Sequence, residues 1–425
     1  MAINHYSWKD GAAPIQQHSI AKHRILQSYL SAYFQTLVCS PSQDVLRLTL
    51  VDGFAGGGIY YHSDTNELIK GSPFVCLDAT READFLINQD RHKPVKMEVS
   101  YFFIESNRDA YLHLDKVLRE HGHSAALGNS IQLKHAKFQD EADAIIRFIK
   151  QKSPKNGRSI FVLDQYGYRD VPTGIIQKIF ASLPSAEIIL TFGVDSFLNF
   201  ASDKKLTQEL LNEVGIPHLW QGRTLEEIKK SERDWRYFIQ STLYRELVSR
   251  CGAEYFTPFF IRNKKGHGDY WLIHMSQHHR ARDVMTEVHW SNHNYFIHYG
   301  GAGLNMFQIM GYDPEHDSRF KNQYDLGFEF DHVARDASIA SLMEQIPRLI
   351  YAHDEGMSFG ELFTKTCNSS PASAAIYRDA LGKLLEEKVI QIKGIDDVQR
   401  RSGQQIKATD QIMSPQQRRL FFFGE

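Results

Sequence analysis

Short apolar runs alternate with amphipathic segments along the first part of the chain. The most apolar runs occupy residues 46–51, 101–104, 159–163 and 187–192. Near-continuous apolar runs of this length are typical of strands buried on both faces of a parallel sheet. Segments with helical spacing of apolar residues lie between these runs, at 108–119, 141–150 and 174–182. The alternation predicts a doubly wound α/β sheet.

Two aromatic-rich runs follow at 255–262 and 269–275, separated by a Lys/Gly turn. This pattern predicts a β-hairpin. A methyltransferase sheet ends in an antiparallel hairpin, whereas a plain dinucleotide-binding sheet continues in parallel. We therefore expect a Rossmann-like methyltransferase sheet, mostly parallel, with an antiparallel C-terminal hairpin. The interval 198–251 has largely helical spacing, and we predict that it is an insertion before that hairpin.

A different succession of helical segments and short apolar runs begins near residue 340. Three helical segments at 342–353, 359–366 and 372–388 precede two short apolar runs at 389–392 and 405–408. Three helices followed by a two-stranded wing predict a winged helix. The expected organisation is a methyltransferase-like domain over 1–290, an irregular cover or linker over 291–339, and a winged-helix domain over 340–425.

Composition agrees with a globular chain of more than one domain. Of its 425 residues, 42% are hydrophobic and 24% are charged, the balance of a folded protein of ordinary type. No apolar run approaches the roughly 18 residues of a membrane span. The polar N-terminus lacks the pattern of a signal peptide. We expect a cytoplasmic protein.

A glycine-rich turn follows the first predicted core strand. A strand that ends in glycines and opens a helix offers free amides and a helix dipole to a charged ligand group. We expect this turn to bind S-adenosylmethionine, and the alternative is a tight turn without a ligand. The turn residues assigned to the cofactor are Asp52, Gly53, Phe54, Ala55, Gly56 and Gly58.

Two acidic residues extend this predicted cofactor site. Glu105 ends the second core strand, where a carboxylate binds ribose hydroxyls. It follows Asp52 by 53 residues (105 − 52), well above the roughly 20 of the simple fingerprint, so the first crossover holds an extra loop. Asp140, after the third strand, would accept from the adenine amine. Alternatively, Glu105 is a carboxylate at a helix N-terminus and Asp140 caps a helix.

The fourth strand ends in Asp164-Gln165-Tyr166. Methyltransferases that act on planar amines carry an Asp/Asn-Pro-Pro-aromatic turn at this place. Asp164 and Tyr166 retain the acceptor and the ring, so they are the candidate catalytic residues, while the prolines are missing. The alternative is that Asp164 only organises its loop.

Neither the cysteines nor the histidines form a metal motif. Cys39, Cys76, Cys251 and Cys367 are far apart along the chain and read as buried thiols. The His-rich stretch at 277–298 matches no ligand spacing of a known site. We expect no metal.

The charge pattern leaves the partner of the winged helix open. The whole chain has a net charge of −2, and residues 342–425 carry 11 Lys/Arg against 11 Asp/Glu. Only the tail from Lys388 is basic. The module is therefore compatible with DNA, RNA or protein as its partner.

Several segments together resemble the three-Cys-motif partner (TcmP) family of bacterial proteins. They are 22–30, 51–58, 71–73, 103–105 and 163–167. The resemblance implies a methyltransferase-like sheet and an associated three-Cys-motif protein of the radical S-adenosylmethionine type. Gly53, Gly57, Gln165 and Tyr166 depart from the family pattern, which has Asp-Leu-Phe-Ala-Gly-Pro-Gly and Asp-Pro-Phe-Gly.

The sequence leaves three functions open. The first is methyl transfer from S-adenosylmethionine to a nucleic-acid base amine. The second is a non-catalytic binding protein that recruits nucleic acid or a radical S-adenosylmethionine partner through the winged helix. The third, a nicotinamide-dependent oxidoreductase, is disfavoured by the predicted hairpin.

Overall fold

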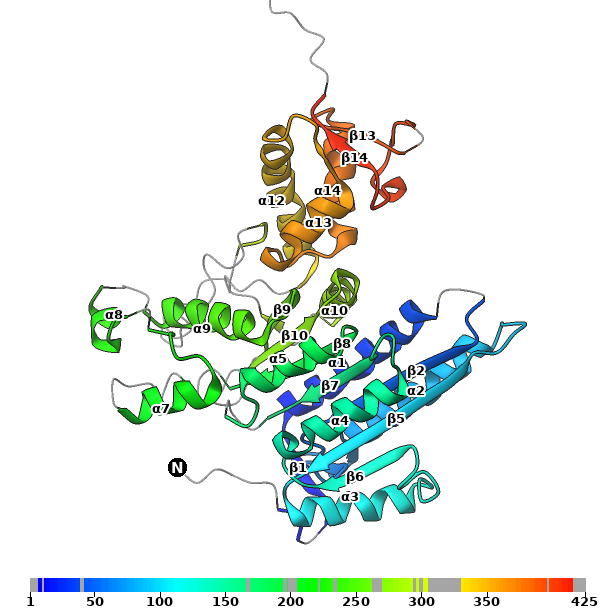
Figure 1. The fold of residues 1–425 in the computed structure, drawn as a ribbon. Helices are drawn as coiled ribbons and strands as arrows, with labels where there is room; N and C mark the ends of the chain where they lie inside the picture. Colours follow the sequence, from blue (N-terminus) through cyan, green and yellow to red (C-terminus); the bar gives the residue numbers. More distant parts are fainter. Residues whose placement is uncertain are drawn as a thin grey trace, which may run out of the picture. The chain divides into compact units, whose positions relative to one another are not determined.

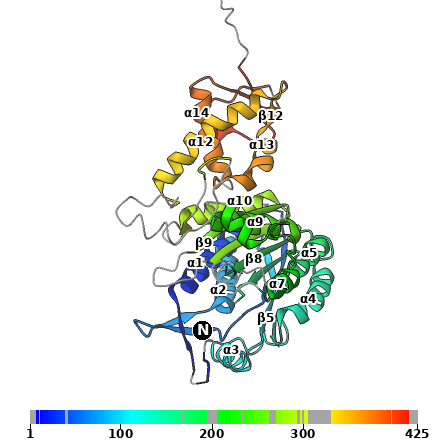
Figure 2. The ribbon, with the colours of Figure 1, turned by 90° about the vertical axis from the view of Figure 1, so that its left-hand side faces the viewer.

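The computed structural model describes residues 7–9, 11–38, 42–165, 169–193, 197, 205–220, 222–231, 235–261, 270–292, 296–297, 301–304, 330–395 and 397–415. The chain forms two compact units, the first built from Met1–Ile297 and the second from most of the residues that follow. Figures 1 and 2 show the ribbon from two sides.

An eight-stranded sheet forms the centre of the first unit. Its order is β11-β9-β10-β8-β7-β2-β5-β6. The strands are β2 (Val45–Asp52), β5 (Lys96–Glu105), β6 (Ile131–His135), β7 (Ser159–Leu163), β8 (Ala186–Phe192), β9 (Tyr255–Ile261), β10 (Tyr270–Ser276) and β11 (Phe296–Ile297). Five neighbouring strands of the sheet, β6, β5, β2, β7 and β8, are parallel. β10 is antiparallel to both β8 and β9. This is the order of a Rossmann-like methyltransferase sheet, as the hairpin predicts.

Helices cover both faces of this sheet. Figure 2 shows α1 (Gln17–Leu37) and α2 (Ser72–Asn88) on one side of the strands, and α4 (Phe138–Lys152) and α5 (Thr173–Ser182) on the other. β7 and β8 are buried along their whole length, because both faces are covered. The remaining helices of the first unit are α3 (Arg108–Glu120), α7 (Lys205–Val214), α8 (Leu225–Ser231), α9 (Trp235–Cys251) and α10 (His279–Ser291).

The extra loop of the first crossover is a β-hairpin. After the glycine-rich turn the chain forms β3 (Ile59–His62) and β4 (Leu68–Lys70), and only then enters α2. β1 (Ala13–Ile15) pairs in parallel with β3. The extra loop expected in the first crossover is therefore confirmed, and this inserted hairpin contributes to the long spacing between Asp52 and Glu105.

The second unit is a winged helix. It contains α12 (His332–Tyr351), β12 (Met357–Ser358), α13 (Phe359–Thr366), α14 (Ala374–Glu386), β13 (Gln391–Lys393) and β14 (Gln411–Met413), with short 3₁₀ turns at Cys367–Ser369 and Gly403–Gln405. Its sheet has the order β12-β14-β13. The strand expected at 405–408 is wrong. Gly403 packs against Gly382 of α14, so this segment turns, and the strand begins after Asp410.

The predicted cysteine environment holds where it is described. Cys76, Cys251 and Cys367 are buried thiols that form no disulfide among the described residues, whereas Cys39 lies outside the described residues. Among the helices that the structure describes, none is long and apolar enough to cross a lipid bilayer.

Candidate functional site

The glycine-rich turn after β2 is held by hydrogen bonds from its backbone amides. Four successive amides donate to protein acceptors over 2.8–3.1 Å: Gly53 to Val162 O, Phe54 to Asp52 Oδ1, Ala55 to Ile104 O and Gly56 to Glu105 Oε2. The expectation that these amides are free for a charged ligand group is therefore wrong. The turn instead fixes the carboxyl ends of three neighbouring strands against one another.

Glycine is required in this turn for conformation and for packing. Gly56 and Gly58 have φ angles of +59° and +81°, a region that favours glycine. A Cβ at Gly57 would lie 2.3 Å from the ring of Trp8. Trp8 is buried, so the turn is covered by the N-terminal segment.

A cavity of about 380 Å³ opens beside this turn. It borders residues that follow the carboxyl ends of β2, β5, β6 and β7, including the β2–β7 boundary, where the direction of strand progression reverses. In α/β sheets ligands bind at this switch point, and the volume falls within the usual range for small-molecule sites. Its lining comprises Trp8, His18, Ser19, Lys22, His23, Gly53, Phe54, Gly56, Tyr60, Ser72, Glu105, Ser106, Asn107, Ala110, Ala136, Lys137, Phe138, Gln139, Asp164, Gln165 and Asp170.

The structure brings together some of the predicted site residues and separates others. Those that line the cavity are Gly53, Phe54, Gly56, Glu105 and Asp164. Asp52, Ala55 and Gly58 belong to the same turn but are absent from that lining. Asp140 is exposed in the first turn of α4, which begins at Phe138 with Lys137 as its N-cap, so Asp140 is not a cap. Its neighbour Gln139 lines the cavity instead. Tyr166 lies outside the described residues.

Glu105 connects the cavity to the turn. Its Oε2 accepts from Gly56 N at 2.8 Å and its Oε1 from Asn107 N at 2.6 Å. Burial raises the pKa of Glu105, although these amide bonds act against the rise. Asn107, not Glu105, is the N-cap of α3. Each oxygen of a carboxylate accepts more than one hydrogen bond, so Glu105 retains acceptor capacity at the cavity wall.

Asp52 is a buried supporting carboxyl of the turn. Its side chain is 1% exposed, and burial raises its pKa to about 7, with hydrogen bonds from Ser72 and from Phe54 N acting against the rise. The nearby charges of Asp164 and Glu105 raise it further. Asp52 therefore changes protonation near neutral pH.

Asp164 forms an ion pair with a residue that precedes the sheet. Lys22 Nζ on α1 lies 2.6 Å from Oδ1 and 2.7 Å from Oδ2 of Asp164. Burial acts to raise the pKa of Asp164, but the charge and hydrogen bonds of Lys22, together with a hydrogen bond from Thr191, outweigh it, and the pKa lies below its usual value. The carboxylate is thus ionised at neutral pH, and the one ammonium of Lys22 donates to both of its oxygens.

Gln165 takes the place of the missing proline and closes the following loop. Its Oε1 accepts from Asp170 N at 3.0 Å and from Val171 N at 3.1 Å. The side chain is 2% exposed. Because its carbonyl oxygen is committed to two backbone amides, the orientation of the amide group is fixed by the hydrogen-bond network.

Two histidines of α1 share the wall that carries Lys22. His18 and His23 line the cavity, and burial lowers the pKa of each to about 4. Both imidazoles are neutral at pH 7. Sequence reasoning missed this wall, because helical periodicity marks the apolar face of α1 and gives no sign that polar residues beside it reach a cavity. The only sequence signal is the run Lys22-His23-Arg24 in the stretch that carries the family resemblance.

Aromatic side chains from outside the core sheet also reach the cavity. The rings of Trp8 and Tyr60 lie 5.0 Å apart, edge to face, and both line it. Trp8 precedes β1 and Tyr60 lies on β3, so the small sheet of β1, β3 and β4 supplies this side of the site. Neither residue belongs to a motif that can be recognised in the sequence.

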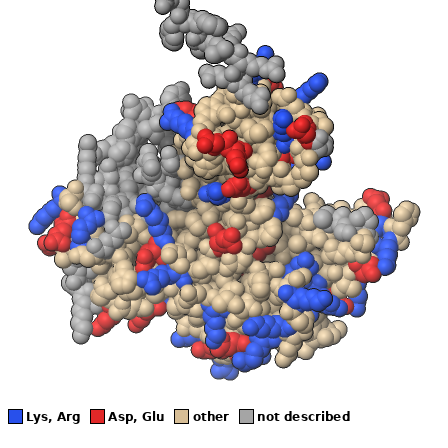
Figure 3. All heavy atoms as spheres, turned by 45° about the horizontal axis from the view of Figure 1, so that its top comes forward, with Lys and Arg blue, Asp and Glu red and all other residues tan. Residues whose placement is uncertain are grey.

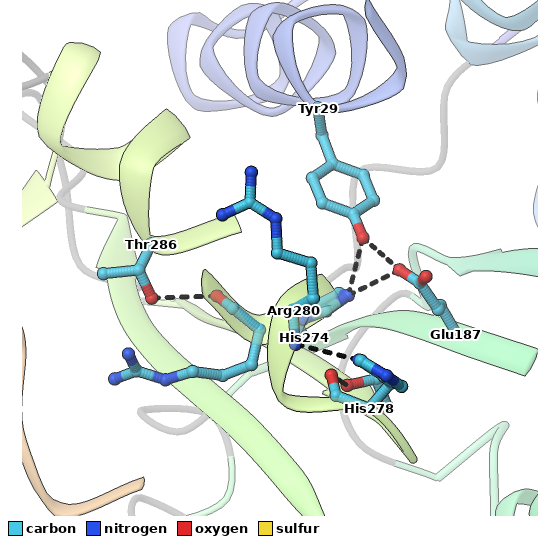
Figure 4. A network of polar contacts seen from close by, with 8 residues as sticks. Tyr29, Glu187, His274, His278, Arg280 and Thr286 are labelled. Carbon is cyan, nitrogen blue, oxygen red and sulfur yellow. Dashed lines mark hydrogen bonds and ion pairs between the residues drawn. The ribbon is translucent and has the colours of Figure 1, made fainter. Parts of the chain in front are cut away.

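A second polar network lies at the opposite end of β8, away from this cavity lining. Figure 4 shows the Tyr29 hydroxyl directed at Glu187 and His274. Tyr29 donates to Glu187 Oε2, and His274 Nε2 lies 3.1 Å from the hydroxyl and 3.0 Å from Glu187 Oε2. All three side chains are buried. They join α1 to β8 and β10, which indicates a structural role.

The His-rich stretch is used for structure. His278 is the N-cap of α10 and its Nδ1 accepts from Arg280 N at 3.1 Å, while His289 is buried and stacks on Phe259. Within the described part of the chain, no group of three or more His, Cys, Asp or Glu side chains is arranged to hold a metal ion.

Comparison with protein families supports the C-terminal assignment. Residues 311–394 match the family model described as the GMT-like wHTH domain. No curated protein matches the chain.

Several solved structures match the chain at low identity. A Legionella pneumophila protein matches at 13% identity and a TM-score of 0.34, covering 62% of this chain and 85% of its own. A putative S-adenosyl-L-methionine-dependent methyltransferase from Methanococcus maripaludis matches at 10% identity and a TM-score of 0.27. The match covers 65% of this chain and 97% of that protein's chain. Trm1 from Pyrococcus horikoshii, solved with S-adenosyl-L-methionine, matches at 9% identity and a TM-score of 0.29. The match covers 63% of this chain and 58% of the Trm1 chain. The strand order of the eight-stranded sheet identifies the fold.

Proposed function

We propose that this chain binds S-adenosylmethionine in the cavity at the ends of β2, β5, β6 and β7 and transfers its methyl group to a nucleic-acid base amine. The observation that carries the proposal is the link between Glu105 Oε2 and Gly56 N, 2.8 Å long, which places a carboxylate with spare acceptor capacity beside the glycine turn. That pairing at a switch point suits a nucleoside ligand.

The residues around the cavity fit the parts of this cofactor. Glu105 would accept from ribose hydroxyls. Phe138 and Gln139, which follow β6, would border the adenine, with Gln139 taking the place expected for Asp140. When bound, the cofactor supplies an electrophilic methyl group on a sulfonium.

The chain's own residues would orient the acceptor. Asp164 lines the cavity with an ionised carboxylate, and each of its oxygens has lone pairs beyond the one directed at Lys22. An amine held there donates to Asp164. Methyl transfer depends chiefly on alignment of the two reactants, and burial of Trp8 over the turn keeps water from that side.

Calorimetric titration with S-adenosylmethionine and S-adenosylhomocysteine tests the cofactor assignment. Wild type should bind both, and Glu105→Gln should bind each about 10-fold more weakly, since it loses one charge-assisted acceptor. Asp140→Asn is the matched control, because Asp140 is exposed outside the cavity lining, and its affinity should equal that of wild type. Failure of wild type to bind either compound at millimolar concentration would sink the proposal.

A second candidate is a non-catalytic methyltransferase-like binding protein. The observation that favours it is that both oxygens of Asp164 already accept from Lys22, with Gln165 in place of proline. This candidate predicts cofactor binding without methyl transfer. Incubation with methyl-labelled S-adenosylmethionine and mixed DNA and RNA oligonucleotides separates the two, since only the enzyme labels a base.

The winged helix is the proposed contact to a macromolecular partner. On α14, Arg378 donates to Ile406 O at 3.2 Å and stacks over the Phe359 ring, while Asp379 pairs with Arg335. Figure 3 shows Lys and Arg side chains interspersed with Asp and Glu over the described surface in view. DNA, RNA and the three-Cys-motif protein implied by the TcmP resemblance therefore all remain candidates. Fluorescence anisotropy with duplex DNA and single-stranded RNA tests the two nucleic acids, and binding of neither favours the protein partner.

A further inference from the structure

Within the described part of the chain, the side-chain amide of Gln165 makes hydrogen bonds through its oxygen but not through its nitrogen. Oε1 accepts from Asp170 N and Val171 N. Nε2 is buried, and among the residues that the structure describes it has no hydrogen-bond partner. A buried donor without an acceptor costs about 1–3 kcal/mol. The position therefore favours occupation of the cavity by a molecule that supplies an acceptor.

The other described side-chain amides at the cavity wall do not have a buried nitrogen without an acceptor. Gln139 Nε2 donates to Asp170 O at 2.6 Å, and the Asn107 side chain accepts from two amides of α3 as its N-cap. Within the described cavity lining, the buried side-chain amide nitrogen without a hydrogen-bond partner belongs to Gln165. It is also the residue that directly follows Asp164.

Adjacent acceptor and donor groups select the complementary edge of a planar ligand. Asp164 offers carboxylate oxygens and Gln165 offers an N–H, and both residues line the same cavity. An exocyclic amine beside an unprotonated ring nitrogen presents the matching donor and acceptor. Adenine has this edge at its amine and N1, and cytosine at its amine and N3, whereas an alkylamine has only the donor.

Building on the proposed function, we infer that Gln165 Nε2 donates to the ring nitrogen next to the amine held by Asp164, so that the methyl acceptor is an amino-substituted nitrogen heterocycle of the adenine or cytosine type. Gln165 is a specificity-determining residue in this arrangement. The reaction itself forms the bond from the amine nitrogen to the methyl carbon and breaks the bond from that carbon to sulfur. The amine proton is released to solvent.

Deaza bases test the hydrogen bond directly. The probes are single-stranded DNA oligonucleotides with one central adenine, 1-deazaadenine, cytosine or 3-deazacytosine, titrated against protein saturated with S-adenosylhomocysteine. Wild type should bind each natural base about 5- to 150-fold more tightly than its deaza analogue, the range for leaving a buried donor unpaired. One natural base with this preference is sufficient.

Gln165→Glu is the matched variant. A carboxylate can keep an oxygen acceptor for the Asp170 and Val171 amides while removing the donor. The variant should bind S-adenosylhomocysteine like wild type and should lose the preference for the natural base.

The outcomes separate this inference from the proposed function. Normal S-adenosylhomocysteine binding with equal affinity for the natural and deaza bases, or with the preference retained in Gln165→Glu, overturns the inference alone. Normal S-adenosylhomocysteine binding with no binding of any oligonucleotide overturns the inference and the nucleic-acid acceptor of the proposed function, and leaves the cofactor assignment standing. Failure to bind S-adenosylhomocysteine overturns the proposed function and this inference with it.

Discussion

The ammonium of Lys22 lies within 2.7 Å of both carboxylate oxygens of Asp164. The two residues are 142 positions apart in sequence. Lys22 lies on the helix before the sheet, and Asp164 follows the fourth strand of the α/β core. The pair therefore joins the first helix to the candidate catalytic turn, and it keeps Asp164 ionised.

Removal of one partner should cost more than removal of both. Lys22→Met leaves a mostly buried carboxylate without its cation and should lower the free energy of unfolding by about 2–4 kcal/mol. Asp164→Leu combined with Lys22→Met should recover part of that loss. Urea unfolding of the two single variants and the double variant measures the coupling. Additive effects would show that the contact contributes no coupling to stability.

Asp52 should make stability fall as pH rises towards neutrality. The pKa of Asp52 is raised by burial to about 7 from an ordinary 3.8, so the folded protein holds this proton more tightly than the unfolded chain does. Stability is therefore lost between about pH 4 and 7. Asp52→Asn keeps an oxygen for Phe54 N and lacks the titration.

Unfolding by urea at several pH values checks this expectation. The free energy of unfolding of Asp52→Asn, relative to wild type, should increase from pH 5 to pH 8. Asp140→Asn, an exposed substitution, should show no such trend. A flat difference for Asp52→Asn would mean that its carboxyl is ionised throughout.

The Tyr29 hydroxyl should contribute to stability through Glu187 and His274. Burial and then the charge of Glu187 raise the pKa of Tyr29 well above its usual value, so the hydroxyl is a donor at all working pH values. Tyr29→Phe leaves the buried Glu187 with one partner fewer in this network and should cost about 1–3 kcal/mol.

Tyr33→Phe is the matched control for that substitution. Tyr33 is also a buried tyrosine on α1, and among the described residues no hydrogen bond joins it to this network. Its cost in urea unfolding should be smaller. Equal costs for the two variants would remove the special role of the Glu187 contact.

The wing of the second unit should depend on Arg400 and Asp410. Arg400 Nε and Nη2 donate to the two carboxylate oxygens at 2.8 Å and 3.1 Å, and Asp410 also accepts from Lys407 N. The hydrogen bond from Arg400 holds the pKa of Asp410 below its usual value. Arg400→Met should destabilise the winged helix by about 3–5 kcal/mol.

Hydrogen exchange of β13 and β14 in the full chain detects this loss. Lys393→Met breaks the exposed Lys393–Asp397 pair and should change protection by about 1 kcal/mol or less. Unaltered protection in Arg400→Met would show that the wing is held by its apolar contacts.

Sequence periodicity determined the parts of this protein that depend on local burial. The continuous apolar runs of β7 and β8 and the hairpin of β9 and β10 predicted the sheet, because a strand covered on both faces must be apolar along its length. The helices of the winged helix followed from their spacing for the same reason. The glycine turn and Glu105 were found because strand ends have fixed places in such a sheet.

Tertiary structure alone decided the walls of the candidate site. Trp8, Lys22 and Tyr60 come from segments without a strand-end motif, and only the packing of α1 and the β1–β3–β4 sheet brings them to the cavity. Asp140 shows the converse. Both Gln139 and Asp140 are exposed in the first turn of α4, but only Gln139 lines the cavity. Sequence identifies a carboxylate such as Asp164, but its charge state and its partner depend on contacts between residues that are distant along the chain.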